Sequence, residues 1–238
     1  MNTAAMRFLS AAALLLALAT CGKSQPAAQS GLPSTADLVA AVAAATESLS
    51  SAHFALTHHE GRTAMGGLLM MDSAEGDIQF PSTVRATFSG AVPAFNTAIK
   101  IDLVQVGPQA AITDPFSGRW RAADTAALPF QFTDLDKTFA AAFRALEFPT
   151  VALSQPESGV ATYTVTGQVP TAVLAPLLPS VLKGGRTRID LVVGRDDKLP
   201  RVIRIHGPLL AHDMPAVVRL LHLSAFNQPV SVQLPPAS

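Results

Sequence analysis

The chain has 238 residues, and its 17 Lys and Arg residues balance 17 Asp and Glu residues. This balance provides no basic field for DNA or RNA, so nucleic acid is excluded as an expected partner. Charged residues make up only 14% of the chain, against about 25% in an average soluble domain, and 49% of the residues are hydrophobic. The apolar excess predicts a large core, a partner interface or a ligand cavity, and composition does not choose among the three.

The N-terminus is typical of an exported lipoprotein. A positive residue precedes a small and apolar stretch at residues 8–19, which is too short to cross a bilayer as a helix, since spanning needs about 20 residues. We predict a signal peptide over residues 1–20, lipidation of Cys21 and a flexible tether over residues 21–33. The alternative is an ordinary signal peptide with an incidental cysteine, because Thr20 stands where lipoproteins usually have Gly, Ala or Ser.

Residues 34–238 are predicted to form one domain that begins with a helix. Ser34 and Asp37 suit a helix N-terminus, and apolar residues at helical spacing extend the helix to about Ser51. The period then changes to two, which indicates strands. Strands are expected at residues 52–59, 66–72, 77–80, 83–89, 96–106 and 109–113, with turns at 73–76, at Pro81 and at 114–118.

A second helix is expected from Thr133 or Asp134 to just before Pro149, with a broad apolar stripe along one side. Further strands are expected at residues 160–169, 186–193, 201–207, 216–223 and 230–234, with a short helical piece at 171–178 and a hairpin turn at 196–200. Because strands follow strands through short turns, the fold class is α+β with antiparallel pairing.

The strands carry apolar residues on both faces, and two helices cannot cover both faces of so large a sheet. We predict a strongly curved sheet that wraps around the helices and leaves an apolar cavity; a flat sheet that dimerises through its apolar face is the alternative. Strand alternation places Phe54, Leu56, Val84, Phe88, Ile99, Ile101, Leu103, Leu191, Val193, Ile203 and Ile205 along this cavity, opposite Leu135, Phe139 and Phe143 of the second helix.

Motifs for catalysis and cofactor binding are absent from the sequence. There is no nucleophile elbow, Walker loop or dinucleotide fingerprint. His58 and His59 are adjacent, and neighbouring strand residues point to opposite faces, so they do not suit one metal ion. His206, His212 and His222 lie far apart, with no cysteine or close carboxylate pair to complete a ligand set. We therefore expect no enzyme activity, no cofactor and no metal site.

Five short segments together resemble a known family. They are the lipobox at Cys21 and residues 51–54, 73–81, 113–120 and 223–230. In this order they resemble the actinobacterial LppX/LprG-type envelope lipoproteins along almost the whole chain. The resemblance implies a half-barrel antiparallel sheet curved around helices, with an apolar pocket for the acyl chains of envelope lipids or glycolipids. It also implies a closing hairpin near the C-terminus and, for some members, cooperation with a major-facilitator-type transporter.

The expected function is therefore carriage or presentation of an acylated lipid or glycolipid by a protein that is lipid-anchored to the outer leaflet of the plasma membrane and faces the periplasm. Two acyl chains exposed to water cost roughly 20 kcal/mol, so a lipid that crosses an aqueous envelope needs an apolar site. An accessory lipoprotein that docks on a transporter without binding lipid is the first alternative. A lipid-modifying hydrolase is the second.

Overall fold

Most of the molecule is one open antiparallel sheet. The computed structural model describes residues 31–65, 69–92, 94 and 97–236, so the signal peptide, Cys21 and most of the tether lie outside the described residues. The strands of the described part are β1 (Ser51–Glu60), β2 (Thr63–Met65), β3 (Leu69–Gln79), β4 (Thr83–Val92), β5 (Thr97–Val106), β6 (Gln109–Thr113), β7 (Trp120–Ala123), β8 (Glu147–Glu157), β9 (Val160–Pro170), β10 (Arg186–Gly194), β11 (Pro200–His206) and β12 (Val218–Ser224). The helices are α1 (Thr35–Glu47) and α2 (Leu135–Arg144), with short 3-10 turns η2 (Thr125–Ala127) and η3 (Thr171–Leu174).

The order of the strands joins the two halves of the chain at the middle of the sheet. The order is β7-β6-β5-β4-β3-β1-β12-β11-β10-β9-β8, and β2 pairs with β3 beside this path. The junction is the antiparallel pair β1–β12, in which Phe54 lies opposite Leu223 and Leu56 opposite Leu221. The first and last long strands are therefore neighbours.

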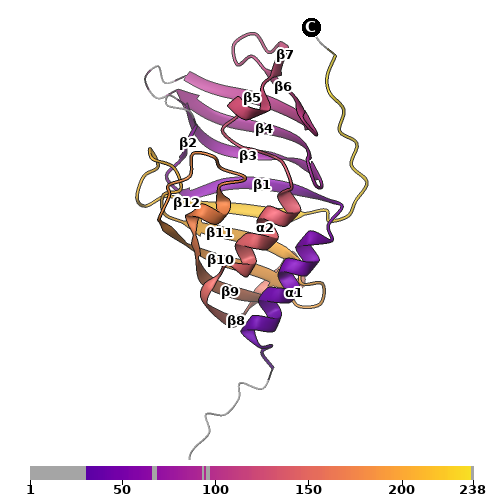
Figure 1. The fold of residues 1–238 in the computed structure, drawn as a ribbon, viewed down its shortest axis with the longest axis vertical. Helices are drawn as coiled ribbons and strands as arrows, with labels where there is room; N and C mark the ends of the chain where they lie inside the picture. The colour runs from indigo at the N-terminus through magenta and orange to yellow at the C-terminus, as the bar shows by residue number, and fades with distance from the viewer. Residues whose placement is uncertain (1–30, 66–68, 93, 95–96, 237–238) are drawn as a thin grey trace, which may run out of the picture. The chain divides into compact units, whose positions relative to one another are not determined.

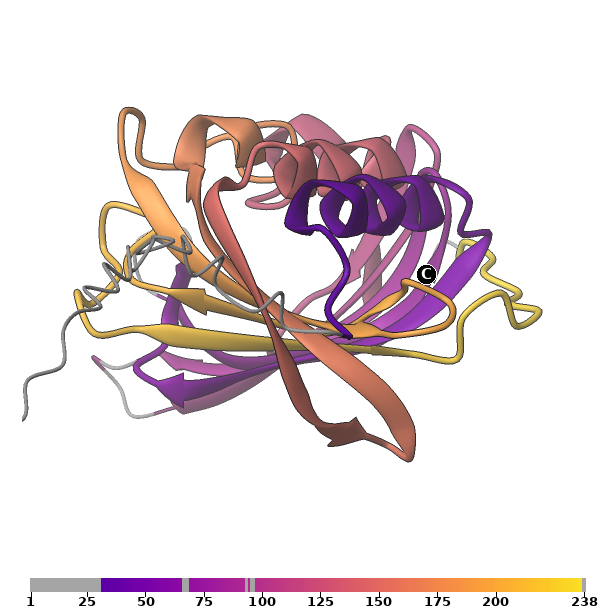
Figure 2. The same ribbon diagram turned by 90° about the horizontal axis from the view of Figure 1, so that it is seen from below.

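The sheet curves, and both helices lie on its concave side (Figures 1 and 2). They cover the half of the sheet that contains β8 to β12 (Figure 1). Two hydrogen bonds of 2.6 Å between Arg144 of α2 and Glu47 of α1 join the helices at the surface. The prediction of a strongly curved antiparallel α+β sheet is confirmed. No helix of the described residues is long and apolar enough to cross a membrane.

The predicted cap of the first helix is real, whereas Asp134 makes no side-chain cap hydrogen bond to the second helix. The Ser34 hydroxyl accepts a hydrogen bond from the Asp37 backbone N–H at 3.3 Å, as expected for an N-cap. Helix α1 ends at Glu47, a turn earlier than predicted, and Leu49 is buried beyond its end. Helix α2 begins after Asp134, whose φ of 48° lies in the left-handed region.

Four local predictions are wrong. The second helix was expected to continue to just before Pro149, whereas α2 ends at Arg144 and β8 begins at Glu147. Residues 73–76 are not a turn but the middle of β3, where Gly76 lies so close to β4 that a Cβ would be 2.0 Å from the Arg85 carbonyl oxygen. Strand β8 was not predicted, because Pro149 and a bulge at Phe148 interrupt its pattern. Residues 230–234 form no strand, so β12 ends in a turn followed by an extended tail and not in a closing hairpin.

Candidate functional site: an apolar cavity beside helix α2

An apolar cavity of about 150 Å³, here called the inner compartment, lies between the concave face of the sheet and α2. Its walls are Phe54, Leu56, Thr63, Met71, Ala74, Ile78, Phe88, Ile203, Ile205, Arg219, Leu221 and Leu223 from the strands, Leu135, Phe139 and Phe143 from α2, and Phe130, Phe132, Leu174, Leu177, Leu178, Leu209 and Leu210 from η3 and the connections. Thr63 and Arg219 are the only polar residues among them.

A second cavity, the outer compartment, adjoins the first. It has a volume of about 640 Å³, within the roughly 300–1,000 Å³ that is typical of ligand pockets. It lies over β4, β5 and β6, beside Ala64, Met65 and Leu69, and its other walls are the chain around η2 and residues 179–180 and 210–212. The two compartments share four wall residues, namely Phe88, Phe130, Phe132 and Leu210.

Three of these shared residues form an aromatic partition between the compartments. The rings of Phe88 and Phe130 are stacked, with centroids 5.9 Å apart and planes within 5° of parallel. Phe132 lies 6.2 Å from Phe130 at an angle of 41°. Such ring pairs are worth about 0.5–1.5 kcal/mol beyond the area that they bury.

Strand alternation explains how the sequence builds the floor. Residues two apart on a strand face the same side, and residues opposite each other on neighbouring strands share that side. Phe54 and Leu56 of β1 therefore lie beside Leu223 and Leu221 of β12 in one apolar patch. The apolar stripe of α2 covers this floor from the other side.

A buried ion pair closes one end of the inner compartment. The side chains of Arg219 and Asp213 form a direct ion pair, with exposed fractions of 5% and 0%. The Asp213 carboxylate also accepts hydrogen bonds from the backbone N–H groups of Leu209 and Leu210, at 2.9 Å each, and so holds these two wall residues in place. Arg219 Nε donates to the Thr63 hydroxyl at 2.6 Å. Burial lowers the pKa of Arg219 from its ordinary value, although Asp213 opposes this shift.

Most of the residues predicted from alternation lie along the two compartments. Phe54, Leu56, Phe88, Leu135, Phe139, Phe143, Ile203 and Ile205 line the inner compartment, and Phe88, Ile101 and Leu103 line the outer one. Ile99 lies at a separate narrow crevice. Val84, Leu191 and Val193 line neither compartment and are buried in packed core.

Sequence reasoning missed several groups of wall residues, among them Met71, Ala74 and Ile78 of β3, a strand that the predicted turn at 73–76 interrupted. Leu221 and Leu223 could have been found by the same alternation, because they follow it on β12. Phe130, Phe132 and Leu210 lie in connections without a period, and only their apolar character marked them.

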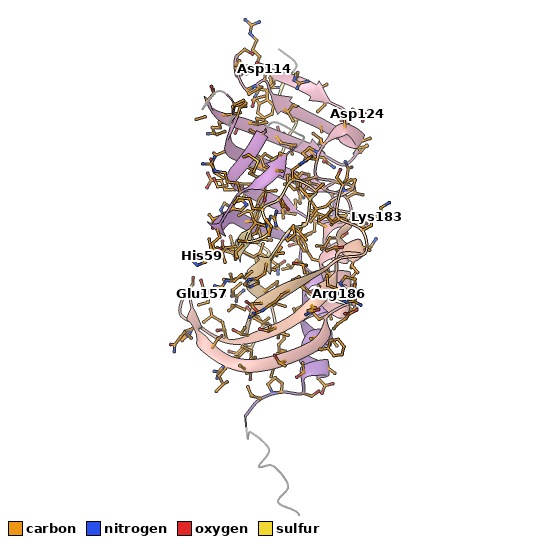
Figure 3. The ribbon with its side chains drawn as sticks, turned by 90° about the vertical axis from the view of Figure 1, so that its left-hand side faces the viewer. His59, Asp114, Asp124, Glu157, Lys183 and Arg186 are labelled. Atoms are coloured by element: carbon orange, nitrogen blue, oxygen red, sulfur yellow. The ribbon has the colours of Figure 1, made fainter. Side chains whose placement is uncertain are left out.

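His206 and Asp190 are paired at 2.8 Å, as are His53 and Asp77, and none of these four residues lines either compartment. His58 contacts the Asp72 carbonyl oxygen at 2.7 Å and the Thr63 hydroxyl at 2.8 Å, and burial is the main cause that lowers its pKa. His59 is exposed, and it lies at the periphery of the molecule with the other labelled polar residues of Figure 3. Within the described residues, no group of three or more His, Cys, Asp or Glu side chains is placed to hold a metal ion.

Comparison with known proteins identifies the fold. The model of the family described as LppX_LprAFG lipoprotein matches residues 34–232. LprF from Mycobacterium bovis superposes with a TM-score of 0.66 at 20% identity, over 87% of this chain and 100% of LprF. Lipoprotein LppX from Mycobacterium tuberculosis superposes with a TM-score of 0.54 at 16% identity, over 84% of this chain and 100% of LppX. At these identities the likeness shows a common fold. No curated protein sequence has a significant match.

Proposed function

This chain belongs to the LppX/LprAFG lipoprotein family, and from this we propose that it carries or presents acylated lipids or glycolipids at the outer face of the plasma membrane. Membership in a lipoprotein family indicates association with the cell envelope. The observation that carries the proposal is the apolar cavity between the concave sheet and α2, which adjoins the larger outer compartment. Each methylene moved from water into such a site contributes about 0.8 kcal/mol, so acyl chains are the ligand that best suits these walls.

The proposed site consists of the wall residues that face the cavity from both sides. Phe54 and Leu56 of β1 and Ile203 and Ile205 of β11 would contact the acyl chain from the sheet, and Phe139 would contact it from α2. No residue in this site is proposed to react with the lipid. Lipidation of Cys21 would keep the protein at the membrane while residues 22–33 tether the domain to it.

The test is mass spectrometry of the purified protein under native conditions, with Cys21→Ser so that its own lipid is not counted. We expect lipid to co-purify at one molecule per chain and to be replaceable by an added acyl lipid. Phe139→Glu places a carboxylate at the apolar wall, and burying a charge without a partner is unfavourable, so bound lipid should be lost. The matched control is Ala141→Glu, on the exposed side of the same helix, which should keep its lipid.

The outcome that would refute the proposal is a folded protein that is free of lipid in repeated preparations and binds none when lipid is added. That outcome would favour the alternative function, an accessory lipoprotein that docks on a transporter without binding lipid. Hydrolysis of an added acyl ester that is lost on replacing one Ser or His would instead make it an enzyme.

A further inference from the structure

Phe130 differs from the other residues of the aromatic partition in how it is held. Phe88 is buried on β4, in the middle of the hydrogen-bonded sheet. Phe130 is half-buried and lies between η2 and α2, in a stretch that is neither helix nor strand. The segment that carries Phe130 can therefore shift without breaking a sheet hydrogen bond, whereas the backbone at Phe88 is paired with both β3 and β5.

We infer that Phe130 determines the lengths of acyl chain that this protein binds. Short chains fit within one compartment and leave the Phe130 ring in place, whereas longer chains occupy both compartments and must displace it. The inference rests on the proposed lipid binding. A short chain in either compartment leaves the stacked rings of Phe88 and Phe130 in contact. A longer chain that occupies both compartments has to pass the residues that line both, and Phe130 is one of these, so its ring is displaced.

The size of the two opposing effects predicts the form of the chain-length dependence. Each added methylene that is buried tightens binding by about fourfold. Separating one stacked ring pair weakens binding by about two- to tenfold, which cancels the gain from one or two methylenes. The affinity of the wild type should rise with chain length, stay level over about one or two carbons where the ring is displaced, and then rise again.

The experiment measures dissociation constants of saturated fatty acids in single-carbon steps by titration calorimetry. In Phe130→Ala the partition is open, so we expect a continuous rise of about fourfold per methylene without the level stretch. Phe130→Leu is a milder variant that fills the space without a ring, and it should shorten the level stretch. Phe116→Ala removes a phenylalanine that is 82% exposed and lines neither compartment, and it should keep the wild-type profile.

The outcomes separate this inference from the proposed function. If the wild type binds fatty acids but Phe130→Ala and Phe130→Leu, both folded, keep its profile, the role of Phe130 is refuted and lipid binding stands. A wild type that rises continuously, with no level stretch, also refutes the partition. If no lipid co-purifies with the wild type and it binds no added fatty acid, both the proposed lipid binding and the role of Phe130 are refuted.

Discussion

The ion pair between Arg219 and Asp213 is expected to be essential for the stability of this domain, and Arg219→Met tests it. The substitution removes the guanidinium but keeps a flexible apolar side chain of similar length. It leaves the Asp213 carboxylate, whose side chain is 0% exposed, without its cation. That carboxylate holds Leu209 and Leu210 at the wall of the inner compartment, so the loss should also loosen this end of the cavity.

The magnitude follows from the burial of both partners. Removing one member of a buried ion pair typically lowers the free energy of unfolding by about 3–5 kcal/mol, because the remaining charge is buried without a partner. Asp213→Asn should be destabilising for the same reason. The double variant should be less destabilised than the sum of the single variants, since neither charge is then left alone, and the expected coupling is about 0.5–3 kcal/mol.

Urea denaturation followed by circular dichroism measures the effect. The free energy of unfolding falls by about 2 kcal/mol per molar urea, so the unfolding midpoint for Arg219→Met should fall by roughly 1.5–2.5 M. The matched control is Arg186→Met, which removes an exposed arginine paired with Glu147 and should change the midpoint little. If Arg219→Met behaves like Arg186→Met, the argument from burial is wrong. Limited proteolysis should also show new cleavage between residues 207 and 217.

Three further predictions concern the core, a close strand contact and the helix pair. Phe143 is 2% exposed, so Phe143→Ala should lower the free energy of unfolding by about 3–5 kcal/mol in the same urea assay; a loss below about 1 kcal/mol would contradict this. Gly76→Ala brings a Cβ to 2.0 Å from the Arg85 carbonyl oxygen, so it should lower the free energy of unfolding by about 1–3 kcal/mol or more and with it the melting temperature. An unchanged melting temperature would show that β3 and β4 can move apart at this point without loss of stability. The hydrogen bond from Arg144 lowers the pKa of Glu47 below its ordinary value of 4.5, so this pair stabilises the fold above that pH and the stabilisation is lost as pH falls through the lower folded value. The midpoint difference between wild type and Glu47→Gln should therefore shrink on acidification, and a difference that grows would reverse the assignment.

The sequence predicted the elements well where a period is uninterrupted. The alternation of Phe54 and Leu56 placed β1 and its inward face, and the stripe of Phe139 and Phe143 placed α2 and its covering side. Gly76 misled because glycine commonly marks a turn, whereas here it permits a close approach of two strands. Whether Gly76 lies in a turn or permits this close approach depends on the position of β4, which the residues around Gly76 do not specify.

The cavity was harder to predict than the fold. Alternation identifies the side of the sheet that a residue faces, but not whether that place is filled. Leu191 and Val193 face inward where the helices pack closely, so they belong to the core, whereas Ile203 and Ile205 face the inner compartment. The outer compartment depends on Phe130 and other residues of irregular connections, whose positions follow from the whole fold.

The central pairing of β1 with β12 has a consequence for how the domain folds. Until β12, which ends at Ser224, takes its place, the two half-sheets have no strand to join them, and β1 and β11 each present an unpaired edge. Contacts so distant along the chain form slowly, because the intervening loop must first be closed. A chain that lacks β12 would therefore have two incomplete sheets, and loss of a short C-terminal piece that includes β12 should destabilise both halves by leaving an unpaired edge on each.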